Sequence, residues 1–399
     1  MMKFVKVFFI IMTIMGASIL TVGCQLTEKV YQPQNTFVKS ELYADEHFIG
    51  YQNHQLKTEK EIFHLTPEMV ELIDKNIHPH KSLKQQVFDL LNLIFDEEQL
   101  GLAYKNSANL TASQTFKNRE ANCISLTIMA YALAKHANLT VQFHDVEVPE
   151  YWIRNGGYNL LTGHVNLVVS EQKLAQKEYI FNPASIVIDF DPYIRKKEFP
   201  SKIIGKKKIT AMFYTNVAAQ AIIENNFNLA YAYLKKATEY SASYSPAWGN
   251  LGILYRMVGL DQLAINAYEH AITLNPKNYT SITNLGIVFN KVGRYEDAKL
   301  IQKKLHDLRI KNPYYHALLA RDAFYQADYQ TAISRYQLAI KLDGQQHEFY
   351  YGLAKVYAQI GDGSLARKAL KKAIKLNKYP DIDKQYYAKL NLLNENMVN

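Results

Sequence analysis

Cysteine, tryptophan, proline and glycine are all scarce in this sequence of 399 residues, with 2, 2, 11 and 17 copies. Two cysteines cannot build the disulfide framework of a small secreted domain. So few glycines and prolines exclude collagen-like and low-complexity chains, and a hydrophobic content of 48% excludes a mainly disordered one. The chain is too long for a single core, so we expect two or three domains.

The first residues have the pattern of a targeting segment. Lys3 and Lys6 precede an apolar run that ends in Leu20-Thr21-Val22-Gly23-Cys24. This ending resembles the bacterial lipobox, in which the cysteine is lipidated and becomes the mature N-terminus. The resemblance implies a signal peptide over residues 1–23, a lipid on Cys24 and, because Gln25 follows, the outer membrane facing the periplasm. The alternative is an uncleaved anchor helix, and in either case we expect attachment to the membrane of the cell envelope.

The formal net charge is +9, and the basic residues are dispersed rather than gathered in a nucleic-acid-binding motif. We therefore expect no nucleic-acid partner. The densest basic cluster falls between two expected domains, which indicates a solvated linker. Its members are Arg195, Lys196, Lys197, Lys202, Lys206, Lys207 and Lys208.

The N-terminal part of the mature chain begins with a polar stretch and continues with helices. Residues 24–57 are polar and aperiodic, which predicts a tether. Thr66-Pro67 has the pattern of an N-cap followed by a first-turn proline and predicts a helix over residues 67–75. Apolar residues at helical spacing between Leu83 and Ile94 predict a second helix.

From residue 211 onward the sequence repeats with a period of 34 residues, in five units without insertions. The second unit shows the pattern most fully; its marker residues are Trp248, Leu251, Gly252 and Tyr255 in a first expected helix, Ala264, Tyr268 and Ala271 in a second, and Pro276 at the end. The small residues allow two antiparallel helices to approach closely. Each unit buries its apolar face only by stacking on its neighbours.

This pattern resembles the tetratricopeptide repeat. The resemblance implies an all-α solenoid over residues 211–380 that holds a protein or peptide partner in its groove. A capping helix and tail are expected over residues 381–399.

A second group of residues, before the repeats, is a candidate catalytic site. Cys123 begins a helical periodicity that extends to about His136, and the unpaired N–H groups and dipole at a helix start favour a thiolate. His164 opens an alternating stretch that predicts a strand, and a second strand is predicted over residues 185–190, with Asp189 inside it.

This order of residues resembles the transglutaminase-like fold of papain-type thiol enzymes. More narrowly, Arg119 to Cys123, Gly163-His164 and Ile188-Asp189-Phe190 are similar to bacterial transglutaminase-like proteins that carry tetratricopeptide repeats. The resemblance implies an α+β domain over residues 58–205. In it Cys123 is the nucleophile, His164 the general base, and Asp189 the carboxylate that orients the imidazole.

Each of these three assignments has an alternative. Cys123 falls on an apolar helix face and can be an ordinary core cysteine. His136 and His144 are rival bases. Asp191 points to the same face of its strand as Asp189, because side chains alternate along a strand.

We therefore expect an α+β papain/transglutaminase-like domain followed by an all-α tetratricopeptide-repeat solenoid. The expected function is that of an envelope lipoprotein whose cysteine hydrolase or acyltransferase site acts on amide or peptide bonds of a bound protein. Ile124 and Asn166 stand where crosslinking enzymes of this fold have aromatic residues. This difference argues against crosslinking activity more than it argues against the fold. The alternative is a non-catalytic interaction scaffold. His78 and His80 lack a third ligand nearby, so we expect neither a metal nor a cofactor.

Overall fold

The computed structural model describes residues 31, 33, 38–96, 98–105, 107–147, 152–155, 158–161, 164–170, 185–190, 200–377, 386–387 and 389–390, with only the backbone at 152–155 and 158–161. The predicted signal peptide, Cys24 and Asp191 lie outside these residues. Within the described ranges, no helix combines the length and the apolar composition needed to cross a bilayer.

Four short helices open the α+β region: α1 (Glu59–Ile62), α2 (Pro67–Asn76), α3 (Leu83–Phe95) and α4 (Ala112–Asn118). Each follows a hydroxyl residue whose side chain accepts the backbone N–H three residues further on; these residues are Thr58, Thr66, Ser82 and Thr111. Such caps satisfy N–H groups that a helix start leaves without a partner. The helices predicted from residues 67 and 83 are confirmed.

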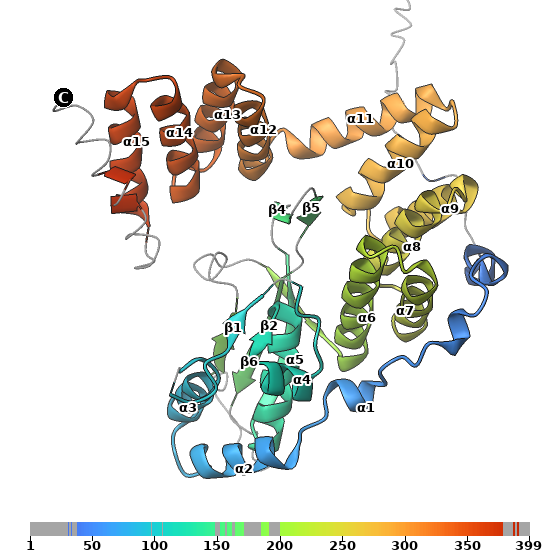
Figure 1. The fold of residues 1–399 in the computed structure, drawn as a ribbon, viewed down its shortest axis with the longest axis vertical. Coiled ribbons are helices and arrows are strands. Elements are labelled where there is room, and N and C mark those ends of the chain that lie inside the picture. Colours follow the sequence, from blue (N-terminus) through green and yellow to red (C-terminus); the bar gives the residue numbers. More distant parts are fainter. Residues whose placement is uncertain are drawn as a thin grey trace, which may run out of the picture. The chain divides into compact units, whose positions relative to one another are not determined.

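A four-stranded antiparallel sheet forms the other half of this region. Its order is β7-β6-β3-β8, and its strands are β3 (Thr140–Val146), β6 (His164–Ser170), β7 (Ser185–Ile188) and β8 (Ser201–Ile204). Helix α5 (Cys123–His136) packs against β3 and β6 (Figure 1). The predicted helix from Cys123 and strand from His164 are confirmed, whereas the strand predicted over residues 185–190 ends at Ile188.

Two smaller strand pairs complete the described α+β region. Strand β1 (Ala103–Tyr104) pairs in parallel with β2 (Glu120–Ala121), immediately before α5. Strand β4 (Trp152–Asn155) pairs antiparallel with β5 (Tyr158–Leu161), between β3 and β6 in the sequence.

Ten helices form the solenoid in the described part of the chain. They are α6 (Lys206–Ile223), α7 (Phe227–Tyr240), α8 (Ser245–Met257), α9 (Asp261–Leu274), α10 (Tyr279–Lys291), α11 (Tyr295–Arg309), α12 (Pro313–Tyr325), α13 (Tyr329–Leu342), α14 (His347–Gln359) and α15 (Gly363–Leu376). The starts of α8, α10, α12 and α14 keep the 34-residue period of the sequence. Helix α6 begins before the predicted start at residue 211.

Glycine is required where the two helices of a repeat meet. A Cβ atom on Gly252 would lie 2.5 Å from the ring of Tyr268, which is itself fully buried. At the junction between two neighbouring repeats, Gly352 of α14 faces the ring of Tyr336 of α13 in the same way. The small residues of the repeat pattern therefore set the distance between paired helices.

The apolar core of the described residues is divided along the solenoid. One continuous cluster extends from Tyr31 to Ile301 and includes the α+β region. A second cluster joins α12, α13 and α14, and a third joins α14 and α15 to Tyr386 and Leu390. The described residues of the predicted capping helix are thus helical and packed on the last repeat.

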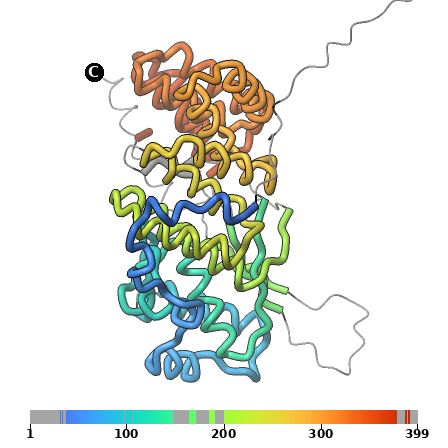
Figure 2. Tube along the Cα trace, turned by 90° about the vertical axis from the view of Figure 1, so that its right-hand side faces the viewer, coloured from blue at the N-terminus to red at the C-terminus, as the bar shows by residue number. Residues whose placement is uncertain are grey.

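The predicted tether is wrong for residues 38–53, which we call the strap. These residues form three 3-10 turns, η1 (Lys39–Leu42), η2 (Asp45–His47) and η3 (Tyr51–Asn53), beside the first repeats (Figure 2). Phe48 stacks on Tyr231 of α7 with ring centroids 4.3 Å apart, and Leu42 is fully buried. A few large apolar side chains fix the strap although its sequence is otherwise polar and aperiodic.

The predicted solvated linker is also wrong in its described part. Lys202 lies in the edge strand β8, and Lys206 and Lys208 lie in the first turn of α6. The Lys208 ammonium is 2.7 Å from a carboxylate oxygen of Asp145 on β3. Lys208 and Lys206, which pairs with Glu59, therefore attach the first repeat to the α+β region. Lys202 pairs with Glu147 within the α+β region.

Candidate functional site

Cys123 is the first residue of α5, and its neighbours hold the helix start in place. Asn122 caps the helix, since its side-chain oxygen accepts the backbone N–H of Ser125 at 2.9 Å. The Ser125 hydroxyl donates to the carbonyl of Ala108 and accepts the N–H of Leu110, both at 2.8 Å. The Cys123 side chain is half-buried. A thiolate at this position is favoured by the helix dipole.

His164 and Asp189 are joined by a hydrogen bond. The His164 Nε2 atom lies 3.0 Å from Oδ2 of Asp189, and the two side chains are 2% and 11% exposed. His164 opens β6, and Asp189 follows directly after β7, the neighbouring strand. Of the two carboxylates proposed from the sequence, Asp189 is bonded to the imidazole, and Asp191 lies outside the described residues.

The chain path brings the starts of α5 and β6 to the same end of the helix-on-sheet layer. A short connection joins the end of α5 to β3, so β3 runs back along the helix. Because β6 is antiparallel to β3, it begins where β3 ends, and His164 is paired with Val146. Cys123 and the His164–Asp189 pair therefore lie at one end of the domain.

The two rival histidines occupy other environments. His136 is the last residue of α5, about 20 Å from Cys123 at 1.5 Å per residue, and its Nε2 atom is 3.0 Å from Asp74 Oδ1. His144 on β3 has its Nδ1 atom 3.1 Å from the Ser201 hydroxyl, and burial lowers the pKa of its imidazole. Neither opens a strand at the Cys123 end.

The face of the sheet that carries Asp189 holds two polar atoms without partners. His144 and Asn166 are directly paired across β3 and β6. The buried His144 Nε2 and Asn166 Oδ1 atoms make no hydrogen bond in the described part of the protein. Buried polar atoms without partners are uncommon and often mark functional surfaces. Asn166 thus lies in a polar neighbourhood with His144.

Sequence reasoning did not show that Asp145, Lys208 and Tyr244 meet where the first repeat packs on the α+β region. Asp145 and Lys208 form the ion pair between the α+β region and α6. Tyr244 lies in the turn between α7 and α8, and burial, followed by the charges of Asp145 and Cys123, raises the pKa of its phenol. No sequence motif marks these residues, because their proximity depends on how the first repeat packs.

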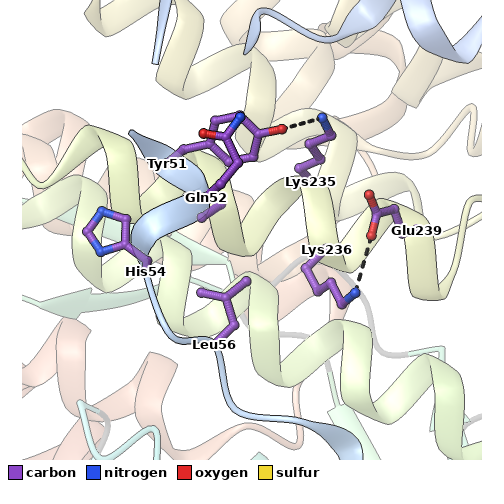
Figure 3. A pocket seen from close by; sticks show the side chains of 8 residues that line it. Tyr51, Gln52, His54, Leu56, Lys235, Lys236 and Glu239 are labelled. Atoms are coloured by element: carbon purple, nitrogen blue, oxygen red, sulfur yellow. Dashed lines mark hydrogen bonds and ion pairs between the residues drawn. The ribbon is translucent and has the colours of Figure 1, made fainter. Parts of the chain in front are cut away.

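A hollow of about 200 Å³ lies elsewhere, between the strap and α7 (Figure 3). It is lined on one side by Tyr51 and Gln52 of the strap and by His54 and Leu56, which follow it, and on the helix side by Ala232, Lys235, Lys236 and Glu239. Figure 3 shows Lys235 bonded to Tyr51 and Lys236 to Glu239, so its charged groups already have partners. The hollow is smaller than the ~300–1,000 Å³ of usual small-molecule pockets.

The described residues contain no group of three or more His, Cys, Asp or Glu side chains placed to hold a metal ion. His78 and His80 stack on one another with ring centroids 5.5 Å apart. Among the described residues, the candidate reactive groups are the thiol of Cys123, the imidazole of His164 and the carboxylate of Asp189.

Family models of the tetratricopeptide repeat match residues 245–278, 267–299 and 318–380. The C-terminal half of the chain therefore contains tetratricopeptide repeats, and the prediction of a repeat solenoid is confirmed. All three matches lie within residues 245–380, so they do not bear on the α+β region.

Curated relatives share part of the chain. The ycf37 protein of Cyanophora paradoxa is 27% identical over 128 residues, which cover 31% of this chain and 74% of that protein. The Photosystem I assembly protein Ycf3 of Prochlorococcus marinus is 28% identical over 97 residues, which cover 24% of this chain and 56% of that protein. The chain thus spans only about half the length of Ycf3.

Among solved structures, the MamA protein of Desulfovibrio magneticus RS-1, from residue 41 to its end, is 19% identical to this chain. The superposition covers 43% of this chain and 96% of that one, with a TM-score of 0.25.

Proposed function

We propose that this protein is a membrane-anchored thiol enzyme that acts on amide or peptide bonds of a protein held by its repeats. The proposal rests chiefly on the hydrogen bond between His164 and Asp189, which are almost completely buried at the end of the sheet where α5 begins. A buried carboxylate bonded to an imidazole, near a thiol at a helix start, is the arrangement that nucleophilic thiol catalysis needs. It agrees with the transglutaminase-like resemblance of residues 58–205.

The proposed chemistry assigns a role to each of the three side chains. With Nε2–H donated to Asp189, the Nδ1 atom of His164 carries the lone pair and takes the proton of Cys123. The thiolate attacks the carbonyl carbon, and the C–N bond breaks as the imidazolium gives its proton to the leaving amine. The resulting thioester is hydrolysed by water or transferred to a second amine, and the His164 imidazole serves as base in both cases.

The solenoid supplies the partner in this proposal. Tetratricopeptide repeats are protein-interaction modules, and the groove of stacked helices accepts peptides and folded surfaces. A partner held there is delivered to a thiol site attached to the same solenoid by Lys208 and Asp145.

We place the protein at the outer membrane, facing the periplasm, through a lipid on Cys24. The support is the lipobox resemblance of Leu20 to Cys24. Metabolic labelling with an alkyne fatty acid should mark the full chain and should fail with Cys24→Ala. Label that persists in Cys24→Ala would contradict the lipid anchor and would leave the proposal for Cys123 unaffected.

The thiol proposal is tested by the rate at which methyl methanethiosulfonate reacts with Cys123 in the full chain. Near neutral pH we expect Cys123 to react at least tenfold faster than glutathione, because an imidazole partner keeps it as thiolate. His164→Ala should remove this advantage. The matched control is His136→Ala, which breaks the other His–Asp pair, at Asp74, and should react like the wild type. A wild-type rate equal to that of glutathione refutes the enzyme.

A non-catalytic scaffold is the second candidate function. It is favoured by the repeats and by the similarity to Ycf3, whose name describes an assembly protein. A pull-down with Cys123→Ala separates the two candidates. An enzyme with a trapped substrate should retain more of its partner in the Cys123→Ala variant than in the wild type, whereas a scaffold should retain equal amounts.

A further inference from the structure

Tyr244 occupies a fixed position between two repeat helices. It is the residue before α8, and the turn that holds it is closed by two backbone hydrogen bonds, from Tyr244 N to Ser241 O at 3.0 Å and from Ala247 N to Tyr244 O at 3.1 Å. The side chain is half-buried and packs against the large core cluster that extends from Tyr31 to Ile301. The repeat boundary thus presents this phenol to the α+β region from a rigid turn.

Charged groups from both parts of the protein surround Tyr244. The Lys208 ammonium, on α6, lies 6.0 Å from the centroid of the Tyr244 ring and 2.7 Å from Oδ2 of Asp145. Asp145 lies on β3 next to Val146, the residue paired with His164. Tyr244, Lys208 and Asp145 therefore gather at the end of the sheet where the thiol and the imidazole lie.

The start of α5 is tied to the first repeat by a second, independent connection. The Asn122 side-chain amide donates to the Asn109 side-chain oxygen at 2.6 Å. The Asn109 amide in turn donates to the backbone carbonyl of Asn216, within α6, at 3.4 Å. The residue immediately before Cys123 is thus linked to the solenoid, and the first repeat borders the thiol through two sets of contacts.

The phenol of Tyr244 is a hydrogen-bond donor available to another molecule. Burial, followed by the charges of Asp145 and Cys123, raises its pKa, so the phenol keeps its proton at neutral pH. Its hydroxyl makes no hydrogen bond with any other residue in the described ranges. A neutral phenol at this end of the sheet can donate to the carbonyl oxygen of a substrate, and a missing donor of this kind slows the reaction.

We propose that Tyr244 is a substrate-positioning residue of the thiol site, whose hydroxyl donates to the carbonyl oxygen of the carboxamide that Cys123 attacks. This inference rests on the proposed function and deepens it, because it makes the first repeat part of the site rather than a separate binding module. The substrate class is therefore a carboxamide presented from the repeat side.

Two thiol reagents separate positioning from general reactivity. Iodoacetamide has a carboxamide that can accept the phenolic hydrogen, and methyl methanethiosulfonate has none. In the full chain, Tyr244→Phe should slow alkylation of Cys123 by iodoacetamide about three- to tenfold, the value of one hydrogen bond. Its rate with methyl methanethiosulfonate should not change.

The matched control is Tyr240→Phe, which removes a phenolic hydroxyl at the end of α7. The Tyr240 ring packs edge-on against Tyr214, with centroids 5.4 Å apart. Both reagents should react with this variant at the wild-type rate, and near-ultraviolet circular dichroism should confirm that both variants keep their packing.

Two results would overturn the inference. Equal iodoacetamide rates in wild type and Tyr244→Phe would show that the hydroxyl makes no contact with the carboxamide. Equal slowing of both reagents would show that Tyr244 acts on the thiolate or on packing. If His164→Ala leaves the methanethiosulfonate rate unchanged while Tyr244→Phe slows iodoacetamide selectively, the proposed catalytic pair fails and the positioning role stands. If Cys123 reacts with neither reagent, both the proposed catalytic pair and the positioning role are overturned.

Discussion

Tyr255 donates its phenolic hydrogen to the main-chain carbonyl of Leu42 at 2.7 Å, although the two residues are 213 positions apart in the sequence. Both side chains are fully buried. The bond joins the strap to α8, inside the second repeat. The strap is therefore a structural part of the solenoid, and the stability of the first repeats depends on it.

Phe48→Ala should destabilise the protein by about 3–5 kcal/mol, because it removes a buried aromatic ring and leaves a cavity beside Tyr231. Urea unfolding followed by the fluorescence of Trp248, which stacks on Tyr43 of the strap, measures this loss. The control is the next residue: Ile49 is 83% exposed, so Ile49→Ala should change stability by less than about 0.5 kcal/mol. Equal effects would mean that the strap is not held by Phe48.

Gly252→Ala should cost about 1–3 kcal/mol, because the new methyl group would lie 2.5 Å from the Tyr268 ring and must push α8 and α9 apart. The thermal midpoint of the helical signal in circular dichroism measures the effect. Gly205 is a suitable comparison, since a Cβ atom there meets nothing within 4 Å and its φ of −85° suits any residue. A Gly252→Ala variant as stable as Gly205→Ala would contradict the close approach of the two helices.

Glu269 should make stability depend on pH. Burial raises the pKa of its carboxyl above the ordinary value of 4.5, although the Tyr31 hydroxyl that donates to it acts in the opposite direction. The folded state then binds the proton more tightly than the unfolded state, so this group's contribution is full below pH 4.5 and is lost as the pH rises through the folded pKa.

Glu269→Gln should therefore be more stable than the wild type at neutral pH. In the wild type this carboxyl lowers the urea concentration at the unfolding midpoint as the pH rises above 4.5, and in Glu269→Gln this decrease should be absent. Tyr31→Phe removes the donor that stabilises the charged carboxylate, so it should enlarge the decrease. A Glu269→Gln variant less stable than the wild type at pH 7 would show that the charged hydrogen bond outweighs the burial.

Asp189→Asn should slow the reaction of Cys123 with methyl methanethiosulfonate at least about tenfold near neutral pH. An amide cannot stabilise the imidazolium of His164, and it can donate to Nε2 and so favour the wrong tautomer. Asp74→Asn breaks the exposed pair with His136 and should have no effect. Asp191→Asn decides between the two candidate carboxylates, and a larger effect there than at Asp189 would reassign the partner of His164.

Regular patterns made most of the fold predictable. Helices α5, α8, α10, α12 and α14 begin where periodicity, small residues and capping residues placed them, because these features act within a few positions of the chain. The strap was missed because only a few of its side chains, such as Leu42 and Phe48, are buried, and their partners lie in α7 and α8. Local composition cannot reveal such distant packing.

The candidate site was predictable only in part. The order of Cys123, His164 and Asp189 pointed to a thiol, an imidazole and a carboxylate, and the bond between the last two is present. The choice between Asp189 and Asp191 required the register of β6 and β7, which alternation alone does not fix. Tyr244 required the packing of the first repeat on the sheet, which no motif encodes.

The division of the apolar core after Ile301 has a consequence for cooperativity. Repeats that share no continuous core can unfold in separate steps, since the free energy of each step comes from its own interfaces. The last two repeats should therefore lose hydrogen-exchange protection before the strap and the sheet do. The last two repeats can therefore change conformation when they bind a protein, while the region that contains Cys123 stays folded.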